Sequence, residues 1–200
     1  MVDAEDLVLV RRVLEGDPDA FEGLVRRHTR AAFAAAFRIT GERTSAEDAV
    51  QEGFLRAYRF LGRFDQKAKF STWMYKIAVN SAIDQLRKGR VEQAHRTELP
   101  EEGANALVEQ PAEAPDPERR ALASEIGRRT QEALDGLTPT ERAAFLLRHY
   151  EGRSIAEISD TLGKRENATK QSIFRAVRKL RAALAPFGGE VLHESDARAV

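Results

Sequence analysis

Apolar residues recur along this chain every three or four positions, and that spacing predicts helices throughout. In a helix such residues line one face, whereas the strands of a sheet alternate apolar and polar residues. The expected helices cover residues 3–15, 19–39, 45–61, 72–88, 119–137, 139–151, 154–162 and 167–184. The fold class is therefore predicted to be all-α, with two small helical domains joined by residues that lack this pattern.

Capping signals define the last three of these helices. Thr138, Pro139 and Glu141 supply an N-cap, a proline for the first helical position and a glutamate that completes a capping box. Residues 154–157 form a second capping box, and Gly163 ends the helix that follows. A short capped helix, a turn and a long basic helix are typical of a helix-turn-helix, whose second helix lies in the major groove of DNA. The alternative is an ordinary helical hairpin with a basic surface.

Residues 64–90 combine aromatic rings with positive charge. Ser71 is expected to cap the helix that begins there. The predicted apolar stripe of that helix consists of Tyr75, Val79, Ala82, Ile83 and Leu86. A different face carries Trp73, Lys76, Asn80 and Arg87. Rings and cations on one surface suit the stacking of unpaired bases and the binding of phosphates. The alternative is that Trp73 fills a local core and the cations are simply solvated.

The pattern over residues 45–61 predicts a helix with an apolar stripe and an acidic face. Ser45 is expected to open this helix, with Asp48 placed close to a capping box. The acidic face contains Asp48, Gln51 and Glu52. This face is either a solvated surface or a docking face for a basic helix of a partner protein.

The chain has 200 residues and no net charge, but its charges are unevenly distributed. Six Lys or Arg and two acids lie within residues 64–90, and seven Lys or Arg and one acid lie within 164–181. Eight acids and one Arg lie within residues 91–118, where four prolines also break any helix. We expect this stretch to be a flexible acidic linker. Two basic segments separated by an acidic one favour a nucleic-acid partner despite the neutral total.

Several classes of protein are disfavoured by the sequence. No run of eighteen apolar residues could span a membrane, and the N-terminus is acidic where a secretory signal would be basic. The absence of cysteine fits a reducing cytoplasm and excludes disulfides and thiolate metal sites. The four histidines form no metal-binding pair, so no metal or other cofactor is predicted. An enzyme is the poorest hypothesis, because no nucleophile–base set or phosphate-binding loop is visible.

Three segments in order resemble the extracytoplasmic-function sigma factors, the smallest sigma-70-type initiation factors of bacteria. Residues 46–61 (AEDAVQEGFLRAYRFL) are similar to the polymerase-docking helix of that family, and residues 70–88 (FSTWMYKIAVNSAIDQLRK) to its promoter-opening helix. Residues 137–163, followed by 172–181, are similar to its final helix-turn-helix domain. The resemblance implies sigma domain two over residues 1–90, the linker over 91–118, sigma domain four over 119–185 and a tail over 186–200.

The resemblance also implies roles for individual residues. The clamp helices of the polymerase β-prime subunit would be contacted by Asp48, Gln51 and Glu52. The minus-ten element would be bound, as its strands separate, by Phe64, Lys69, Phe70, Trp73, Lys76 and Asn80. The loop at about 64–70 would capture an extruded base. The minus-thirty-five element would be read as duplex by Lys170, Gln171, Phe174, Arg175 and Arg178.

The implied partners are core RNA polymerase, through the β-prime clamp helices and the β subunit, and promoter DNA, both duplex and single-stranded. An anti-sigma factor is implied as well, because an exposed polymerase face would otherwise be active at once. The protein is then expected to direct promoter recognition, promoter melting and transcription initiation in the cytoplasm, without a membrane partner. The rival hypothesis is a stand-alone helix-turn-helix regulator. That hypothesis gives no function to residues 48–52 or to the aromatic and basic helix expected over residues 72–88.

The sequence departs from the family at the turn before the last helix. The family usually has an apolar residue and then Gly-Thr-Val there, whereas residues 164–169 are Lys-Arg-Glu-Asn-Ala-Thr. Asn167 is expected to take a left-handed or capping conformation. The loss of the apolar residue is expected to loosen the packing or to shift the start of the reading helix.

Overall fold

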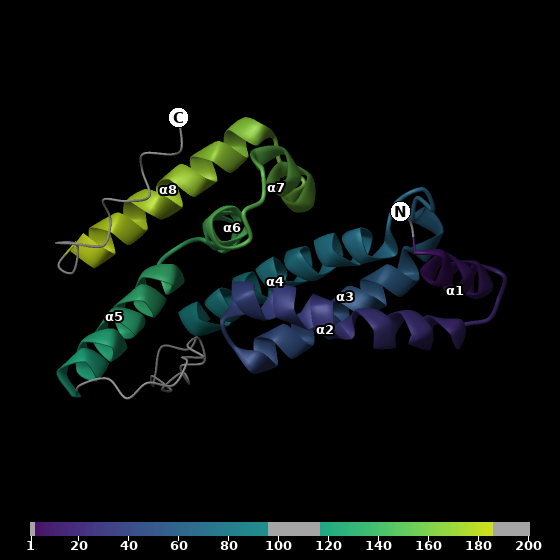
Figure 1. The fold of residues 1–200 in the computed structure, drawn as a ribbon, viewed down its shortest axis with the longest axis horizontal. Coiled ribbons are helices and arrows are strands. Elements are labelled where there is room, and N and C mark those ends of the chain that lie inside the picture. Colours follow the sequence, from purple (N-terminus) through teal and green to yellow (C-terminus); the bar gives the residue numbers. More distant parts are fainter. Residues whose placement is uncertain (1–2, 96–116, 186–200) are drawn as a thin grey trace. The chain divides into compact units, whose positions relative to one another are not determined.

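The computed structural model describes residues 3–95 and 117–185, and the regular elements in these two ranges are all helical (Figure 1). The all-α prediction is therefore confirmed for the described residues. They form two compact units, the first built mainly from residues 3–95 and the second mainly from 117–185. Most of the predicted linker and the predicted tail at 186–200 lie outside the described residues.

The first unit is a bundle in which three long helices pack against one another. Its elements are α1 (Ala4–Leu14), α2 (Ala20–Thr40), α3 (Arg43–Arg59), the short 3-10 helix η1 (Leu61–Arg63) and α4 (Phe70–His95). Helices α2, α3 and α4 contact one another pairwise, and α1 lies along α2. Leu24, Ile39 and Met74 are among the fully buried side chains that fill the space between these helices.

Helix α4 is longer than the sequence predicted. It begins at Phe70, so Ser71, the expected N-cap, lies exposed in the first turn. It ends at His95, beyond Gly89, and therefore includes Val91, the first residue of the expected linker. A glycine inside a helix costs only about 1 kcal/mol relative to alanine, which flanking helix-forming residues can offset.

The buried face of α4 is also rotated from the predicted apolar stripe. Val79, Ala82 and Ile83 are buried as expected, but Tyr75 and Leu86 are only half-buried. The rest of the buried face consists of Phe70, Met74, Ala78 and Ser81. Because α4 packs against both α2 and α3, the buried sector is wider than one stripe and is centred on smaller side chains.

The second unit contains α5 (Pro117–Asp135), α6 (Pro139–Phe145), the π-helical turn η2 (Leu146–Tyr150), α7 (Ile155–Leu162) and α8 (Glu166–Leu184). Helices α5 and α6 both pack against α8. Their shared core consists of Ala133, Leu134, Leu137, Ala176 and Leu180, with Phe145 packed against it. The single helix predicted over residues 139–151 is thus an α-helix that continues into a wider π turn.

Both predicted capping boxes are confirmed. The Glu141 backbone N–H donates to Thr138 Oγ1 at 3.2 Å, and the Thr138 N–H donates to Glu141 Oε2 at 3.0 Å. Ser154 and Glu157 make the same reciprocal pair at 3.2 and 2.9 Å. Glu141 also accepts a bond from Lys179 Nζ at 2.7 Å, which ties the start of α6 to α8. Burial raises the pKa of Glu141, but the bonds from Lys179 and Thr138 outweigh burial and leave that pKa below its ordinary value.

Candidate functional site

The acidic face predicted on the third helix lies on the solvent side of α3. The core side of this helix is formed by Ala46, Ala49, Val50, Gly53, Phe54 and Ala57. Asp48 and Gln51 are exposed, and Glu52 is half-buried. The helix begins at Arg43, two residues before the expected start, and Ser45 instead donates from Oγ to Glu42 Oε2 at 2.6 Å. The three predicted docking residues therefore share one accessible face, although Ser45 does not cap the helix.

Glu52 is the first member of a row of alternating charges that links α3 to α4. Arg56 Nε donates to Glu52 Oε1 at 2.9 Å, and Arg56 Nη1 donates to Asp84 Oδ2 at 2.8 Å. Asp84 also accepts a bond from Arg87 Nη1 at 3.0 Å. The hydrogen bond from Arg56 lowers the pKa of Glu52, so this carboxylate stays ionised at neutral pH. Its charge is partly offset by Arg56, whereas Asp48 keeps a more fully exposed charge.

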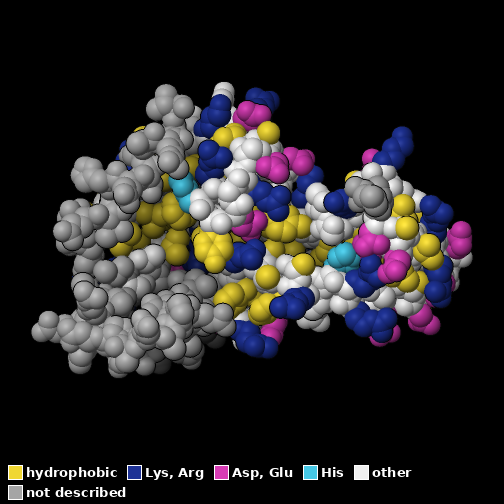
Figure 2. Space-filling view, in the orientation of Figure 1, with side chains coloured by type: hydrophobic (Ala, Val, Ile, Leu, Met, Phe, Trp, Pro, Cys, Tyr) yellow, Lys and Arg dark blue, Asp and Glu magenta, His cyan; other side chains and the backbone are white. Residues whose placement is uncertain are grey.

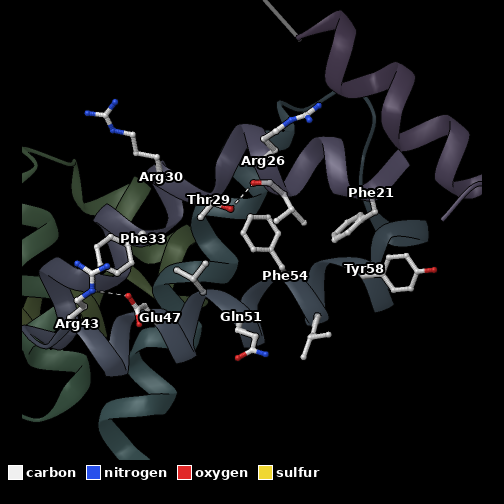
Figure 3. Close-up of a pocket in the computed structure, with 13 residues that line it drawn as sticks. Phe21, Arg26, Thr29, Arg30, Phe33, Arg43, Glu47, Gln51, Phe54 and Tyr58 are labelled. Atoms are coloured by element: carbon white, nitrogen blue, oxygen red, sulfur yellow. Dashed lines mark hydrogen bonds and ion pairs between the residues drawn. The ribbon is translucent and has the colours of Figure 1, made fainter. Parts of the chain in front are cut away.

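An open groove of about 890 Å³ runs between α2 and α3, beside Gln51 (Figure 3). Its lining is largely apolar and consists of Phe21, Val25, Arg26, Thr29, Arg30, Phe33, Arg43, Glu47, Val50, Gln51, Phe54, Leu55 and Tyr58. Arg26 and Arg30 reach outward along the α2 edge, and Gln51 lies on the α3 side. Such a surface can take a helix with an apolar face, in the manner of helix-in-groove binding.

The sequence analysis missed the contribution of α2 to this surface. The sequence feature that could have indicated this contribution is the pair Phe33 and Phe37, which lie four residues apart. In the structure these two rings stack, with their centroids 5.8 Å apart. Phe33 lines the groove, whereas the sequence analysis predicted no functional role for this helix. The groove exists only because α2 and α3 lie side by side, which spacing within either helix does not reveal.

The aromatic residues predicted to handle the minus-ten element form one cluster at the start of α4. The ring centroids are 5.6 Å apart for Phe64 and Phe70, 5.2 Å for Phe64 and Trp73, and 5.7 Å for Phe70 and Trp73. Phe64 and Phe70 are buried, with 6% and 1% of their surfaces exposed, whereas Trp73 is half-buried. Direct base contact by Phe64 and Phe70 is therefore not supported, because their rings are used in packing that holds Trp73.

The polar members of that predicted site surround the cluster. Lys69 lies in the exposed loop over residues 65–69, which is shaped in part by a bond from the Lys67 N–H to Asp65 Oδ1 at 3.0 Å. Lys76 and Asn80 follow Trp73 along α4 at offsets of three and seven residues, so all three lie on one helix face. Asn80 Nδ2 donates to the Lys76 carbonyl at 2.8 Å, which fixes the orientation of the amide.

Helix α8 separates its core residues from its predicted DNA-reading residues. Thr169, Ile173, Ala176 and Leu180 are buried at offsets of 0, 4, 7 and 11 residues. The predicted reading residues are all exposed, namely Lys170, Gln171, Phe174, Arg175 and Arg178. Phe174 is 68% exposed, so its ring is accessible on the same face as these polar residues.

The turn before α8 differs from the expectation placed on Asn167. Gly163 takes the left-handed conformation, with φ of +61°, and Arg165 is the extended N-cap residue. Helix α8 begins at Glu166, so Asn167 lies inside its first turn and is neither left-handed nor a cap. The Thr169 N–H bonds to the Arg165 carbonyl at 3.0 Å, and Thr169 is fully buried. Thr169 thus packs under the start of the helix, in a turn that lacks the apolar residue usual in the family.

Positive and negative side chains are interspersed over much of the face shown in Figure 2. The described residues contain no group of His, Asp and Glu suited to hold a metal ion. Within the same ranges, no helix combines the length and the apolarity needed to cross a bilayer.

Comparison with protein families gives two matches in the order of the two units. The family model for Sigma-70 region 2 matches residues 24–91, and the model for Sigma-70 region 4 matches residues 127–180.

Individual relatives give the same result. The ECF RNA polymerase sigma factor SigE of Mycolicibacterium smegmatis is 35% identical over 172 residues, which cover 86% of this chain and 64% of that protein. The chain thus spans less than two thirds of that relative. The RNA polymerase sigma-H factor of Pseudomonas aeruginosa is 32% identical over 187 residues, 91% of this chain and 95% of that protein. The ECF sigma factor SigW of Bacillus subtilis is 31% identical over 88% of this chain and 94% of its own length.

Two solved structures are similar in fold. CnrH, in complex with the cytosolic domain of CnrY, matches with a TM-score of 0.52 and 26% identity over 92% of this chain and 99% of that chain. The sigma factor RpoE, in complex with the anti-sigma factor NepR from Bartonella quintana, matches with a TM-score of 0.54 and 22% identity. That match covers 82% of this chain and 96% of that chain.

Proposed function

The chain belongs to the extracytoplasmic-function RNA polymerase sigma factors of the sigma-70 family, and on that premise we propose how its two units share transcription initiation. The first unit docks on core polymerase and melts the minus-ten element, and the second unit recognises the minus-thirty-five element as duplex DNA. One observation carries the proposal. The exposed residues predicted for each task lie on the unit that matches the corresponding sigma region.

Docking on polymerase uses the outer face of α3. Asp48 and Glu52 are carboxylates on a single helix face, and Gln51 lies between them with its amide exposed. A basic helix of the β-prime clamp would pair with these carboxylates, which steer its approach and fix its register. The neighbouring groove between α2 and α3 would take apolar side chains of the same helix, so that charge and apolar contact act together.

Melting of the minus-ten element uses Trp73 and the polar groups beside it. Extruding a base costs a few kcal/mol, and stacking on an aromatic ring returns about 1–3 kcal/mol. Phe64 and Phe70 hold the indole of Trp73 from beneath, so the ring is positioned before a base arrives. Lys69 and Lys76 would bind the phosphates of the separated strand, and Asn80 would accept a hydrogen bond from a base edge through Oδ1. Binding free energy drives the opening, without chemistry performed by the chain.

Recognition of the minus-thirty-five element uses the exposed face of α8. Lys170 and Gln171 lie near the start of this helix, which is the part of a recognition helix that reaches base edges. Arg175 and Arg178 follow at offsets suited to phosphates along the groove. Phe174 would contact a thymine methyl group, because an exposed ring on this face gains from apolar contact with DNA.

Regulation and location follow from the same premise. A docking face that is always exposed would let the protein compete continuously for core polymerase. We therefore propose that an anti-sigma factor covers the α3 face or the α8 face until a signal releases it. The cytoplasm is the proposed compartment, because core polymerase and the promoter are found there. The β subunit of polymerase is the proposed contact of the second unit.

In vitro transcription with purified core polymerase and a promoter library tests this function directly. The protein should direct RNA synthesis from a subset of templates, and the absence of RNA synthesis from every template would overturn the proposal.

The double variant Asp48→Arg with Glu52→Arg tests the docking face. It should lower the affinity for core polymerase at least about tenfold, because two attractive charges become repulsive. Glu22→Arg is the matched control, since Glu22 is exposed on α2 outside the docking face. Equal core affinity in both variants would refute the docking assignment.

A further inference from the structure

Helix α1 places a carboxylate in the interior of the first unit. Asp6 is 2% exposed, and its Oδ2 lies 2.9 Å from Nε2 of His28 on α2, which is 9% exposed. An ionised carboxylate only accepts hydrogen bonds, so Nε2–H of His28 donates. Arg27 Nε lies 2.9 Å from the other oxygen, Oδ1, in an ion pair whose geometry is not that of a hydrogen bond. Burying an acid is costly without such partners, so His28 and Arg27 together offset the cost of burying Asp6.

The His28 ring leads from this carboxylate to the start of α4. Its centroid lies 5.1 Å from that of Phe70, which in turn contacts both Phe64 and Trp73. Asp6, His28, Phe70 and Trp73 thus form a continuous row of contacts from α1 to the aromatic cluster. The hydrogen bond from His28 fixes one ring nitrogen, and therefore the plane that the ring presents to Phe70.

We propose that Asp6 and His28 are positioning residues for promoter melting. By holding His28, α1 fixes the ring of Phe70 and thereby the orientation of Trp73 on which an extruded base stacks. This inference rests on the proposed role of Trp73. It also gives a task to α1, which lies before residue 24, where the match to Sigma-70 region 2 begins.

A purely structural role would be the attachment of α1 to α2. That attachment also uses Arg27, which pairs with Asp3 at 2.8 Å and with Glu5. Replacement of Glu5 therefore weakens the attachment of the helix but leaves both partners of Asp6, namely His28 and Arg27, and the ring contacts in place. Glu5→Gln is accordingly the matched control for substitutions of His28.

The experiment uses the full chain and the fluorescence of Trp73, the single tryptophan in the sequence. His28→Ala should shift the emission of Trp73 and change its quenching by acrylamide. It should also lower open-complex formation with core polymerase, measured by permanganate reactivity, by about tenfold, the order expected for loss of one buried hydrogen bond. Core affinity should be unchanged. Asp6→Asn, which keeps an oxygen acceptor for His28, should retain most of the wild-type signal, and Glu5→Gln should match wild type in both readouts.

Unchanged Trp73 fluorescence in His28→Ala, or normal melting, would overturn the inference. The same holds if Glu5→Gln is as defective as His28→Ala. Circular dichroism reports whether each variant folds. If His28→Ala does not fold, Asp6→Ala gives the same test, because it removes the acceptor of the hydrogen bond and retains the rings of His28 and Phe70.

Trp73→Ala separates this inference from the function on which it rests. Normal melting in Trp73→Ala refutes the stacking role itself, whereas defective Trp73→Ala with normal His28→Ala refutes only the positioning role.

Discussion

At the scale of single residues, burial gives opposite roles to aromatic side chains that look alike in the sequence. Phe70 and Phe174 both stand among charged residues, and both were predicted to contact DNA. Phe70 is 1% exposed and lies under Trp73, whereas Phe174 is 68% exposed on α8. The neighbours of each residue along the chain do not distinguish them, because burial depends on which other helix covers that face.

Replacement of Phe174 should separate DNA recognition from stability. Phe174→Ala should leave the free energy of unfolding nearly unchanged and lower the affinity for minus-thirty-five DNA by about 1–3 kcal/mol, the scale of one specific base contact. Its neighbour Ile173 is buried, so Ile173→Ala should instead destabilise the second unit by about 2–5 kcal/mol. Chemical denaturation and fluorescence anisotropy measure the two effects. The assignment fails if Phe174→Ala lowers the free energy of unfolding by more than it lowers the free energy of binding to minus-thirty-five DNA.

The carboxylate of Glu141 should make the second unit sensitive to acid. The folded pKa of Glu141 lies below the ordinary value of 4.5, so its contribution is complete above that pH and is lost as pH falls through the folded pKa. Glu141→Gln should reduce stability by about 1 kcal/mol at pH 7 and by much less in acid. Thr138→Ala should cost about 1 kcal/mol, with little dependence on pH, because it removes only an uncharged cap. Thermal denaturation at a series of pH values checks both, and parallel profiles for Glu141→Gln and wild type would contradict the assignment.

At the scale of elements, two glycines occupy different environments, one within α4 and one on α3 where it faces α4. Gly89 lies inside α4, and a Cβ there would meet no atom within 4 Å. Gly53 on α3 faces α4, where a Cβ would lie 3.3 Å from Cε of Met74. The first glycine thus has room for a Cβ atom, and the second lies where two helices approach closely.

These two glycines should respond in opposite ways to substitution. Gly89→Ala should stabilise the first unit by up to about 1 kcal/mol, because alanine loses less backbone entropy in a helix. Gly53→Val should destabilise it by about 1–3 kcal/mol through overpacking against α4. Denaturation followed by Trp73 fluorescence reports on this unit. Loss of stability in Gly89→Ala would argue against a helix that continues past residue 89.

At the scale of the whole molecule, charge is balanced in total but not in distribution. Lys and Arg number 32, as do Asp and Glu, yet the cations gather in the segments assigned to DNA and the acids gather in residues 91–118. A neutral chain has little non-specific attraction to DNA, so selectivity is left to the exposed contacts on α4 and α8. The acids of residues 91–118 belong to the same chain as the basic helices, so they are expected to weaken non-specific binding to DNA further.

Neutralising these acids should therefore increase non-specific binding. With glutamine in place of Glu98, Glu101, Glu102, Glu109 and Glu113, the affinity for non-promoter duplex should rise about tenfold at low salt. The difference should shrink at high salt because ions screen the charges. The same five positions changed to aspartate form the control, since charge is retained. Anisotropy titrations at two salt concentrations measure the affinity for non-promoter duplex. Equal affinities for the glutamine and aspartate variants would rule out an electrostatic role for residues 91–118.

The sequence by itself determined the features that depend on near neighbours in the chain. Helical spacing predicted the all-α fold, and capping boxes located the starts of α6 and α7. Three motifs in order indicated the family, which the comparisons confirm. These features are local, because residues three or four apart in a helix meet whatever the rest of the chain does.

Only the tertiary structure decided which surfaces are free. It buried Phe64 and Phe70, left Trp73 at the edge, formed the groove between α2 and α3, and joined Asp6 to His28 across 22 positions of the chain. Spacing within one helix says which residues share a face but not what covers that face. Contacts between helices depend on how their backbones approach each other, and small residues such as Gly53 and Ala78 set that approach.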